Sequence, residues 1–226
     1  LEVPQGDLHL VRAQEGWTMA LSCKSSEGRK HPGASGPIED AWHGPLMFVY
    51  GTGDPEQTQV NRRVAEQDAH MGFLRADARH PIKADTEVTP QDVATHGLVL
   101  YGNPQSNRLL ARIVDRLPIH FDADSILVGA MRYKGTDVGT VFVYPNPENP
   151  EAYVLVKAGV TWRGTLLSRN LPWFLPDFVV FDARVSVQNN GRLMDRRPYL
   201  VGGFFDDFWQ VRRAGITTGT SADRSR

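Results

Sequence analysis

Two segments of the sequence share one plan, and this plan constrains the fold more than any other feature. In each segment an apolar run leads through glycine to an Asp or Asn followed by proline, as in LMFVYGTGDP at 46–55 and LVLYGNP at 98–104. Continuous apolar runs of this length indicate strands buried on both faces, as in a parallel sheet. Asp54-Pro55 and Asn103-Pro104 each indicate a helix start, with an N-cap followed by proline at the first helical position. We therefore predict two adjacent strand–turn–helix units.

The helices that follow these turns are predicted from apolar spacing. One runs from residue 55 to about residue 74, and the other occupies 104–117, where Leu109, Leu110, Ile113 and Leu117 recur at helical intervals. Further apolar runs at 125–130, 140–144, 153–157 and 177–182 predict additional strands. The segment 199–209 is apolar and aromatic, and we expect it to close the core.

The fold class that these patterns predict is α/β, with three layers and a mainly parallel sheet of Rossmann-like or flavodoxin-like type. Alternating apolar residues near the N-terminus predict a β-rich ribbon in addition. We predict three regions: ribbon and linker at 1–36, an α/β domain at 37–211 and a disordered tail at 212–226.

Composition excludes several function classes. The formal net charge is −1, which gives no electrostatic basis for nucleic-acid binding. No apolar run approaches the ~20 residues that a membrane helix needs. Cys23 is the single cysteine, so an intrachain disulfide and a cysteine-based zinc site are both excluded. The histidines are scattered and form no H-x-x-x-H pair, and we predict neither a metal nor a cofactor.

Two kinds of functional motif are missing from the sequence. It contains no Gly-x-Ser-x-Gly nucleophile elbow and no glycine-rich phosphate-binding motif, so we predict no catalytic residue. A ligand site is still predicted, because the carboxyl edge of an open α/β sheet is where ligands bind. Five polar residues belong to the two turns at that edge, and a sixth lies in a later turn: Thr52, Asp54, Asn103, Ser106, Asn107 and Asn146. Helix capping alone also explains Asp54 and Asn103.

A string of segments points to a protein family. In order, they are GPIEDAWHGPLMFVYGTG, PIKADTEVT, LVLYGNPQSN, VFVYPNPENPEAYVLVKAG and GGFFDDFW. Together they resemble the C-terminal α/β module of large bacterial proteins, of planctomycete and myxobacterial type, described as α/β-hydrolase, esterase or prolyl-oligopeptidase-like. The resemblance covers about residues 36–209. It implies an upstream domain that holds a Ser-Asp-His site, and an exported, periplasmic or extracellular location.

One departure from the family pattern affects this expectation. Relatives often carry an Asn-Ser-Gly-His-Thr-like turn where this chain has Lys157-Ala158-Gly159-Val160-Thr161, so Val160 replaces the histidine. The sequence begins with Leu1 and shows no signal peptide, and we expect it to be a fragment or a processed product.

Three functions follow as hypotheses. The first is a non-catalytic accessory or interaction module of a hydrolase-like protein, partnered by the upstream hydrolase domain or a processed chain. The second is a ligand-binding or hydrolytic α/β domain that uses the turns 51–57 and 102–107. The third is a structural subunit, such as a homo-oligomer, with residues 204–209 as its interface.

Overall fold

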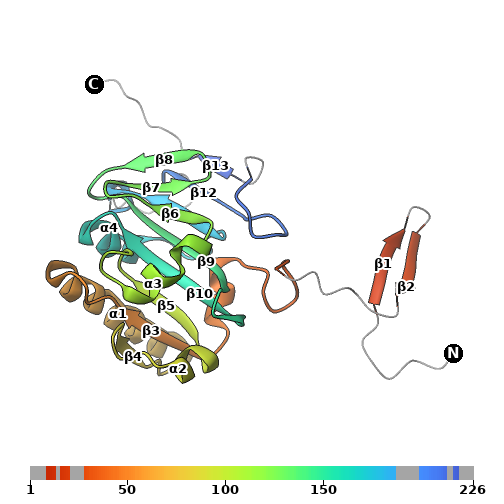
Figure 1. Ribbon diagram of the computed structural model, residues 1–226, viewed down its shortest axis with the longest axis horizontal. Coiled ribbons are helices and arrows are strands. Elements are labelled where there is room, and N and C mark those ends of the chain that lie inside the picture. The colour runs from red at the N-terminus through yellow and green to blue at the C-terminus, as the bar shows by residue number, and fades with distance from the viewer. Residues whose placement is uncertain (1–8, 14–15, 21–27, 187–198, 213–215, 219–226) are drawn as a thin grey trace.

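The computed structural model describes residues 9–13, 16–20, 28–186, 199–212 and 216–218 (Figure 1). Its strands are β1 His9–Ala13, β2 Gly16–Ala20, β3 Leu46–Tyr50, β4 Ile82–Ala84, β5 Gly97–Tyr101, β6 Ile119–Phe121, β7 Ser125–Val128, β8 Met131–Lys134, β9 Gly139–Asn146, β10 Asn149–Gly159, β11 Phe178–Phe181, β12 Val201–Gly203 and β13 Ile216–Thr218. Its α-helices are α1 Pro55–Ala76, α2 Pro90–Thr95, α3 Arg108–Ile113 and α4 Trp162–Leu167. Short 3₁₀ helices are η1 Ile38–Trp42, η2 Val114–Arg116, η3 Ser168–Asn170 and η4 Ala183–Ser186.

An eight-stranded sheet in the order β13-β12-β11-β9-β10-β5-β3-β4 forms the centre of the molecule. The ladders β10–β5, β5–β3 and β3–β4 are parallel, and the other four ladders are antiparallel. Because of these pairings, β9 and β12 run in one direction and the other six strands run in the opposite direction. The predicted α/β class is confirmed.

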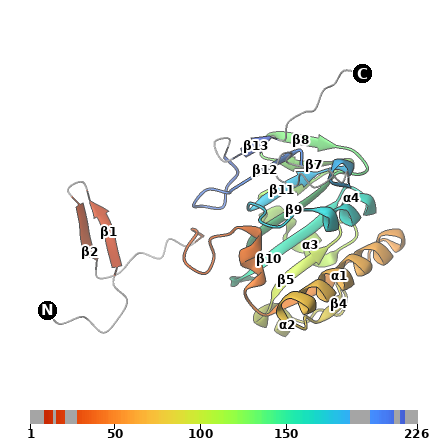
Figure 2. The ribbon, with the colours of Figure 1, turned by 180° about the vertical axis from the view of Figure 1, so that it is seen from behind.

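Both faces of this sheet are covered. The helices α1 and α4 pack against each other on one face. The helix α3 and the three-stranded antiparallel sheet β6-β7-β8 lie on the other face, as the two opposite views show (Figures 1 and 2). The central strands are buried on both sides, which explains their unbroken apolar runs: every residue of β5 and of β11 is buried.

The aromatic segment at 199–209 contributes to the core, as predicted. Trp209 and Phe205 are buried, and Phe205 stacks on Phe178 of β11 with 5.1 Å between ring centroids. Trp209 also contacts Tyr144 of β9 and Tyr153 of β10 edge-on. These rings join the C-terminal part of the chain to the antiparallel half of the sheet.

One predicted helix start is wrong. Asn103-Pro104 does not begin a helix, because residues 103–106 form a turn in which the Ser106 and Asn107 backbone N–H groups both bond to the Asn103 carbonyl. The helix α3 begins at Arg108, and its N-cap is Asn107, whose side-chain oxygen accepts from the N–H groups of Leu109 and Leu110. By contrast, α1 begins at Pro55 as predicted, with Asp54 accepting from the first turn.

The N-terminal ribbon is an antiparallel hairpin of β1 and β2 that lies apart from the α/β body in both views. Within the segment predicted as a disordered tail, Ile216–Thr218 forms β13 and pairs with β12. Cys23, the start at Leu1 and residues 219–226 lie outside the described residues. None of the described helices is both long and apolar enough to cross a membrane.

Candidate functional site

The two turns of the predicted site are neighbours at the carboxyl edge, because the Tyr50 end of β3 pairs with the Tyr101 end of β5. They touch each other directly: the Gly53 N–H donates to the Ser106 carbonyl at 2.7 Å. A Cβ atom on Gly51 would lie 2.4 Å from that same carbonyl oxygen, so only glycine fits this approach. The space between the turns is therefore occupied by backbone of the chain itself.

Asp85 joins these turns from the loop after β4. Its Oδ1 accepts from the Thr52 hydroxyl at 2.6 Å and from the Thr52 N–H, and its Oδ2 accepts from the Arg108 N–H at 2.8 Å. Asp85 is buried, and the positive end of α3 faces its carboxylate. Sequence reasoning assigned Asp85 no such role, because the three segments it connects are far apart in the chain.

Asn107 is the centre of the second turn. Besides capping α3, its side-chain NH₂ donates to the carbonyls of Val49 and Tyr101, on two adjacent strands. Asn103 accepts from the Ser106 N–H and donates to the Val160 carbonyl, and the buried Ser106 hydroxyl donates to the Asn103 carbonyl. These contacts give all three side chains structural partners.

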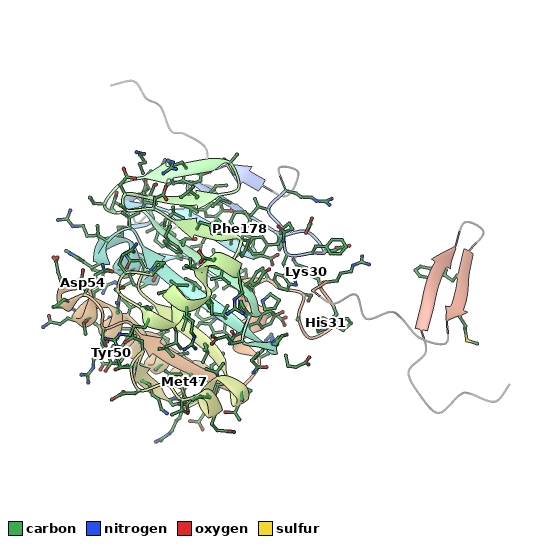
Figure 3. The ribbon with its side chains drawn as sticks, in the orientation of Figure 1. Lys30, His31, Met47, Tyr50, Asp54 and Phe178 are labelled. Atoms are coloured by element: carbon green, nitrogen blue, oxygen red, sulfur yellow. The ribbon has the colours of Figure 1, made fainter. Side chains whose placement is uncertain are left out.

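The side chains of the other two predicted residues make different contacts. Asp54 caps α1, and it lies at the opposite side of the body from Lys30 and His31 (Figure 3). Asn146 ends β9 and pairs with Asn149 at the start of β10, which places it at the amino edge of the parallel strands. Its side-chain oxygen accepts from the Glu148 N–H. Ligand binding by the six residues stays a prediction.

A second polar group lies beneath α1, on a face of the sheet that the motifs did not single out. Tyr101 and Lys157 are paired in register on β5 and β10. The Tyr101 hydroxyl and the Lys157 ammonium both donate to Oδ2 of Asp68 in α1, at 2.7 and 2.5 Å. Their positions in the sequence gave one signal, since Lys157 interrupts an otherwise apolar strand.

This group is largely removed from water. The Lys157 and Asp68 side chains are 11% and 15% exposed, and Tyr101 is fully buried. Burial, together with the adjacent Asp68 charge, raises the pKa of Tyr101 well above its ordinary value, so the hydroxyl keeps its proton and donates. Among the described residues, Asp68 Oδ2 is the one hydrogen-bond acceptor of the Lys157 ammonium.

A cavity of about 370 Å³ opens beside this group. Val141 and Leu155 form its floor on the sheet, and α1 forms one wall with Asp68, Met71 and Gly72. Two further segments complete this lining: η1, with Ile38, Glu39 and Trp42, and the chain after α4, with Ser168, Arg169, Leu171, Pro172, Trp173 and Leu175. Most of the lining is apolar, with a small number of charged groups at defined positions, as is typical of small-molecule sites.

His80 contributes a neutral imidazole to the same cavity. Burial lowers its pKa, against a smaller opposing effect of a hydrogen bond with the Leu46 backbone. The centroid of its ring lies 5.1 Å from the centroid of the Phe48 ring. Within the described part of the chain, no cluster of His, Cys, Asp and Glu side chains is arranged to hold a metal ion.

A second buried ion pair lies outside the cavity. Lys30, in the linker before η1, pairs with the fully buried Asp177 carboxylate, and its ammonium lies 4.8 Å from the centroid of the Trp209 ring. The Phe205 N–H donates to the same carboxylate. This pair attaches the linker to the body.

Comparison with known proteins assigns no family to the chain: no protein-family model matches the sequence, and no curated protein matches it.

Proposed function

We propose that this chain is a ligand-binding α/β domain whose site is the cavity beside Lys157, and that it binds a small carboxylate with an apolar body. The observation that supports this proposal is a buried ammonium, with one described acceptor, at the edge of an apolar cavity of about 370 Å³. A hydrogen bond between a buried ammonium and a carboxylate is strong because both groups are charged. The apolar lining would bury the rest of the molecule.

The arrangement of the sheet supports a site in this region. The parallel strands follow the order β4-β3-β5-β10, so successive strands are added first on one side of β3 and then on the other. This is the order of flavodoxin-like sheets, and we propose that the body is a three-layer α/β fold of that type. Lys157 and Tyr101 are near the carboxyl ends of their strands, which is the end where such folds bind ligands. From there the cavity extends toward Trp42 and His80, which precede β3 and β4.

Octanoate is a suitable probe, because it combines one carboxylate with an apolar chain. Isothermal titration should show binding to the wild-type chain and at least a tenfold loss in a variant carrying Asp68→Asn and Lys157→Met. Both charges are removed together because a single substitution would leave a buried unpaired charge. Lys134→Met is the matched control, since Lys134 is 62% exposed and pairs with Asp124 on the small sheet. Equal affinity in all three proteins would refute the proposal.

A second candidate function is the structural, homo-oligomeric role for which the sequence predicts residues 204–209 as the interface. Phe204 and Phe208 are 55% and 51% exposed, whereas the residue that follows each of them, Phe205 and Trp209, is buried. Exposed aromatic side chains of this kind are enriched at protein interfaces. If they form an interface between copies of the chain, light scattering should give a dimeric or larger mass that Phe204→Ser with Phe208→Ser reduces to the monomer. A monomeric wild type at high concentration would contradict it.

A further inference from the structure

Glu39 lines the cavity and has one carboxylate oxygen without a hydrogen-bond partner among the described residues. This residue belongs to the first turn of η1 and lines the cavity. Its Oε1 accepts from the Leu175 N–H at 2.9 Å. Its Oε2 is buried and has no hydrogen-bond partner in the described structure. A buried carboxylate oxygen without a donor is costly, so a donor in the cavity would be favoured there.

The surroundings of Glu39 suit a positively charged donor. No Lys, Arg or His of the described chain forms an ion pair with Glu39. Trp42, from the same turn, and Trp173, from the segment after α4, also line the cavity. A cavity lined by aromatic side chains and a carboxylate is a common environment for ammonium groups.

The strand β10 separates the two charged ends. The turn that carries Glu39 is held at the level of Tyr153, because the Tyr153 hydroxyl donates to Asp40. Lys157 lies four residues further along the same strand face, which corresponds to roughly 13 Å of strand length. Leu155 lies between them on the cavity floor. Glu39 and Lys157 both line the cavity, and Leu155 and Val141 give its floor an apolar surface.

From this arrangement we infer that the ligand carries an amine as well as an acid, at opposite ends of an apolar body: the ammonium binds Glu39 and the carboxylate binds Lys157. The inference rests on the proposed function and extends it to a ligand class, the extended amino acids whose two charged groups are several carbons apart. An α-amino acid, with both groups on one carbon, does not reach both ends of the cavity.

Three probes of one chain length separate the contributions of the two ends. They are octanoate, 8-aminooctanoate and octylamine, each titrated into the wild type, Glu39→Gln and the control Glu151→Gln. The Glu39→Gln substitution keeps a side-chain oxygen for the Leu175 N–H, which preserves the native contact, and Glu151 is exposed on β10. We expect 8-aminooctanoate to bind the wild type about tenfold more tightly than octanoate does.

The variants then identify the end that is responsible. Glu39→Gln should weaken 8-aminooctanoate to the affinity of octanoate while leaving octanoate unchanged, and Glu151→Gln should change neither. Octanoate binding with no gain from the added amine, or a gain that survives Glu39→Gln, would overturn this inference and leave the proposed function intact. Failure of all three probes to bind would instead refute the proposed function.

Discussion

Replacing Asp68 by alanine tests the energetic role of the buried group beneath α1. The substitution removes the acceptor shared by the Lys157 ammonium and the Tyr101 hydroxyl, which lie 2.5 and 2.7 Å from Asp68 Oδ2. Both donors stay buried, since Lys157 is 11% exposed and Tyr101 is not exposed at all. Breaking a buried ion pair from one side costs about 3–5 kcal/mol. Typical domains are stable by only ~5–15 kcal/mol, so this loss is large.

Urea unfolding followed by circular dichroism measures this loss directly. Asp68→Ala should lower the free energy of unfolding by about 3–5 kcal/mol, and adding Lys157→Met to Asp68→Asn should restore stability relative to Asp68→Asn alone. The exposed pair Lys134–Asp124 serves as the control, and Asp124→Ala should have little effect. A loss below about 1 kcal/mol for Asp68→Ala would refute the view that this group is desolvated and coupled.

The remaining predictions concern the cavity and the carboxyl-edge turns. Burial lowers the pKa of His80 below 6.5, so the contribution of the neutral ring to stability is complete above that pH and is lost as the pH falls toward the folded-state pKa. The free energy of unfolding, measured from pH 7.5 to 4.5, should therefore decrease with falling pH, and His80→Gln should reduce this dependence. Asn107→Ala should lower the free energy of unfolding by more than the ~1 kcal/mol typical of an N-cap, because the carbonyls of Val49 and Tyr101 also lose a donor. In the same urea assay, the control Thr89→Ala at the α2 cap should cost only the typical amount. Gly51→Ala should destabilise by about 1–3 kcal/mol, since its Cβ would lie 2.4 Å from the Ser106 carbonyl oxygen, and an unchanged melting temperature would show that the turn relaxes freely.

Local sequence signals were sufficient where a strand or helix is determined by its own residues. The apolar runs of β3, β5 and β11 predict buried strands because each side of the sheet is covered. Asp54-Pro55 predicts the start of α1 because the cap bonds only to the first turn of its own helix.

The start of α3 shows where such signals fail. From the sequence, Asn103-Pro104 is the predicted helix start, and the sequence assigns Asn107 no capping role. Asn107 is the cap because its amide also bonds to the carbonyls of Val49 and Tyr101, and these contacts exist only once β3 and β5 are paired. A local pattern contains no information about such a contact.

The candidate site was beyond sequence reasoning for the same reason. Lys157 and Asp68 are 89 residues apart, and nothing local links a lysine in a strand to an aspartate in the middle of a helix. Glu39 becomes distinctive only because folding buries one of its oxygens without a donor. Lys157 within an apolar strand was the one visible signal, since a buried lysine requires a partner.

Mapping octanoate by ¹H–¹⁵N NMR tests the central claim most directly, because it locates the ligand on the chain. If the cavity beneath α1 is the site, amide shifts should concentrate at Met71, Leu155 and Lys157 and should saturate with one octanoate per chain. Shifts concentrated at the turns 51–54 and 102–107, or no saturable shifts at all, would contradict the account.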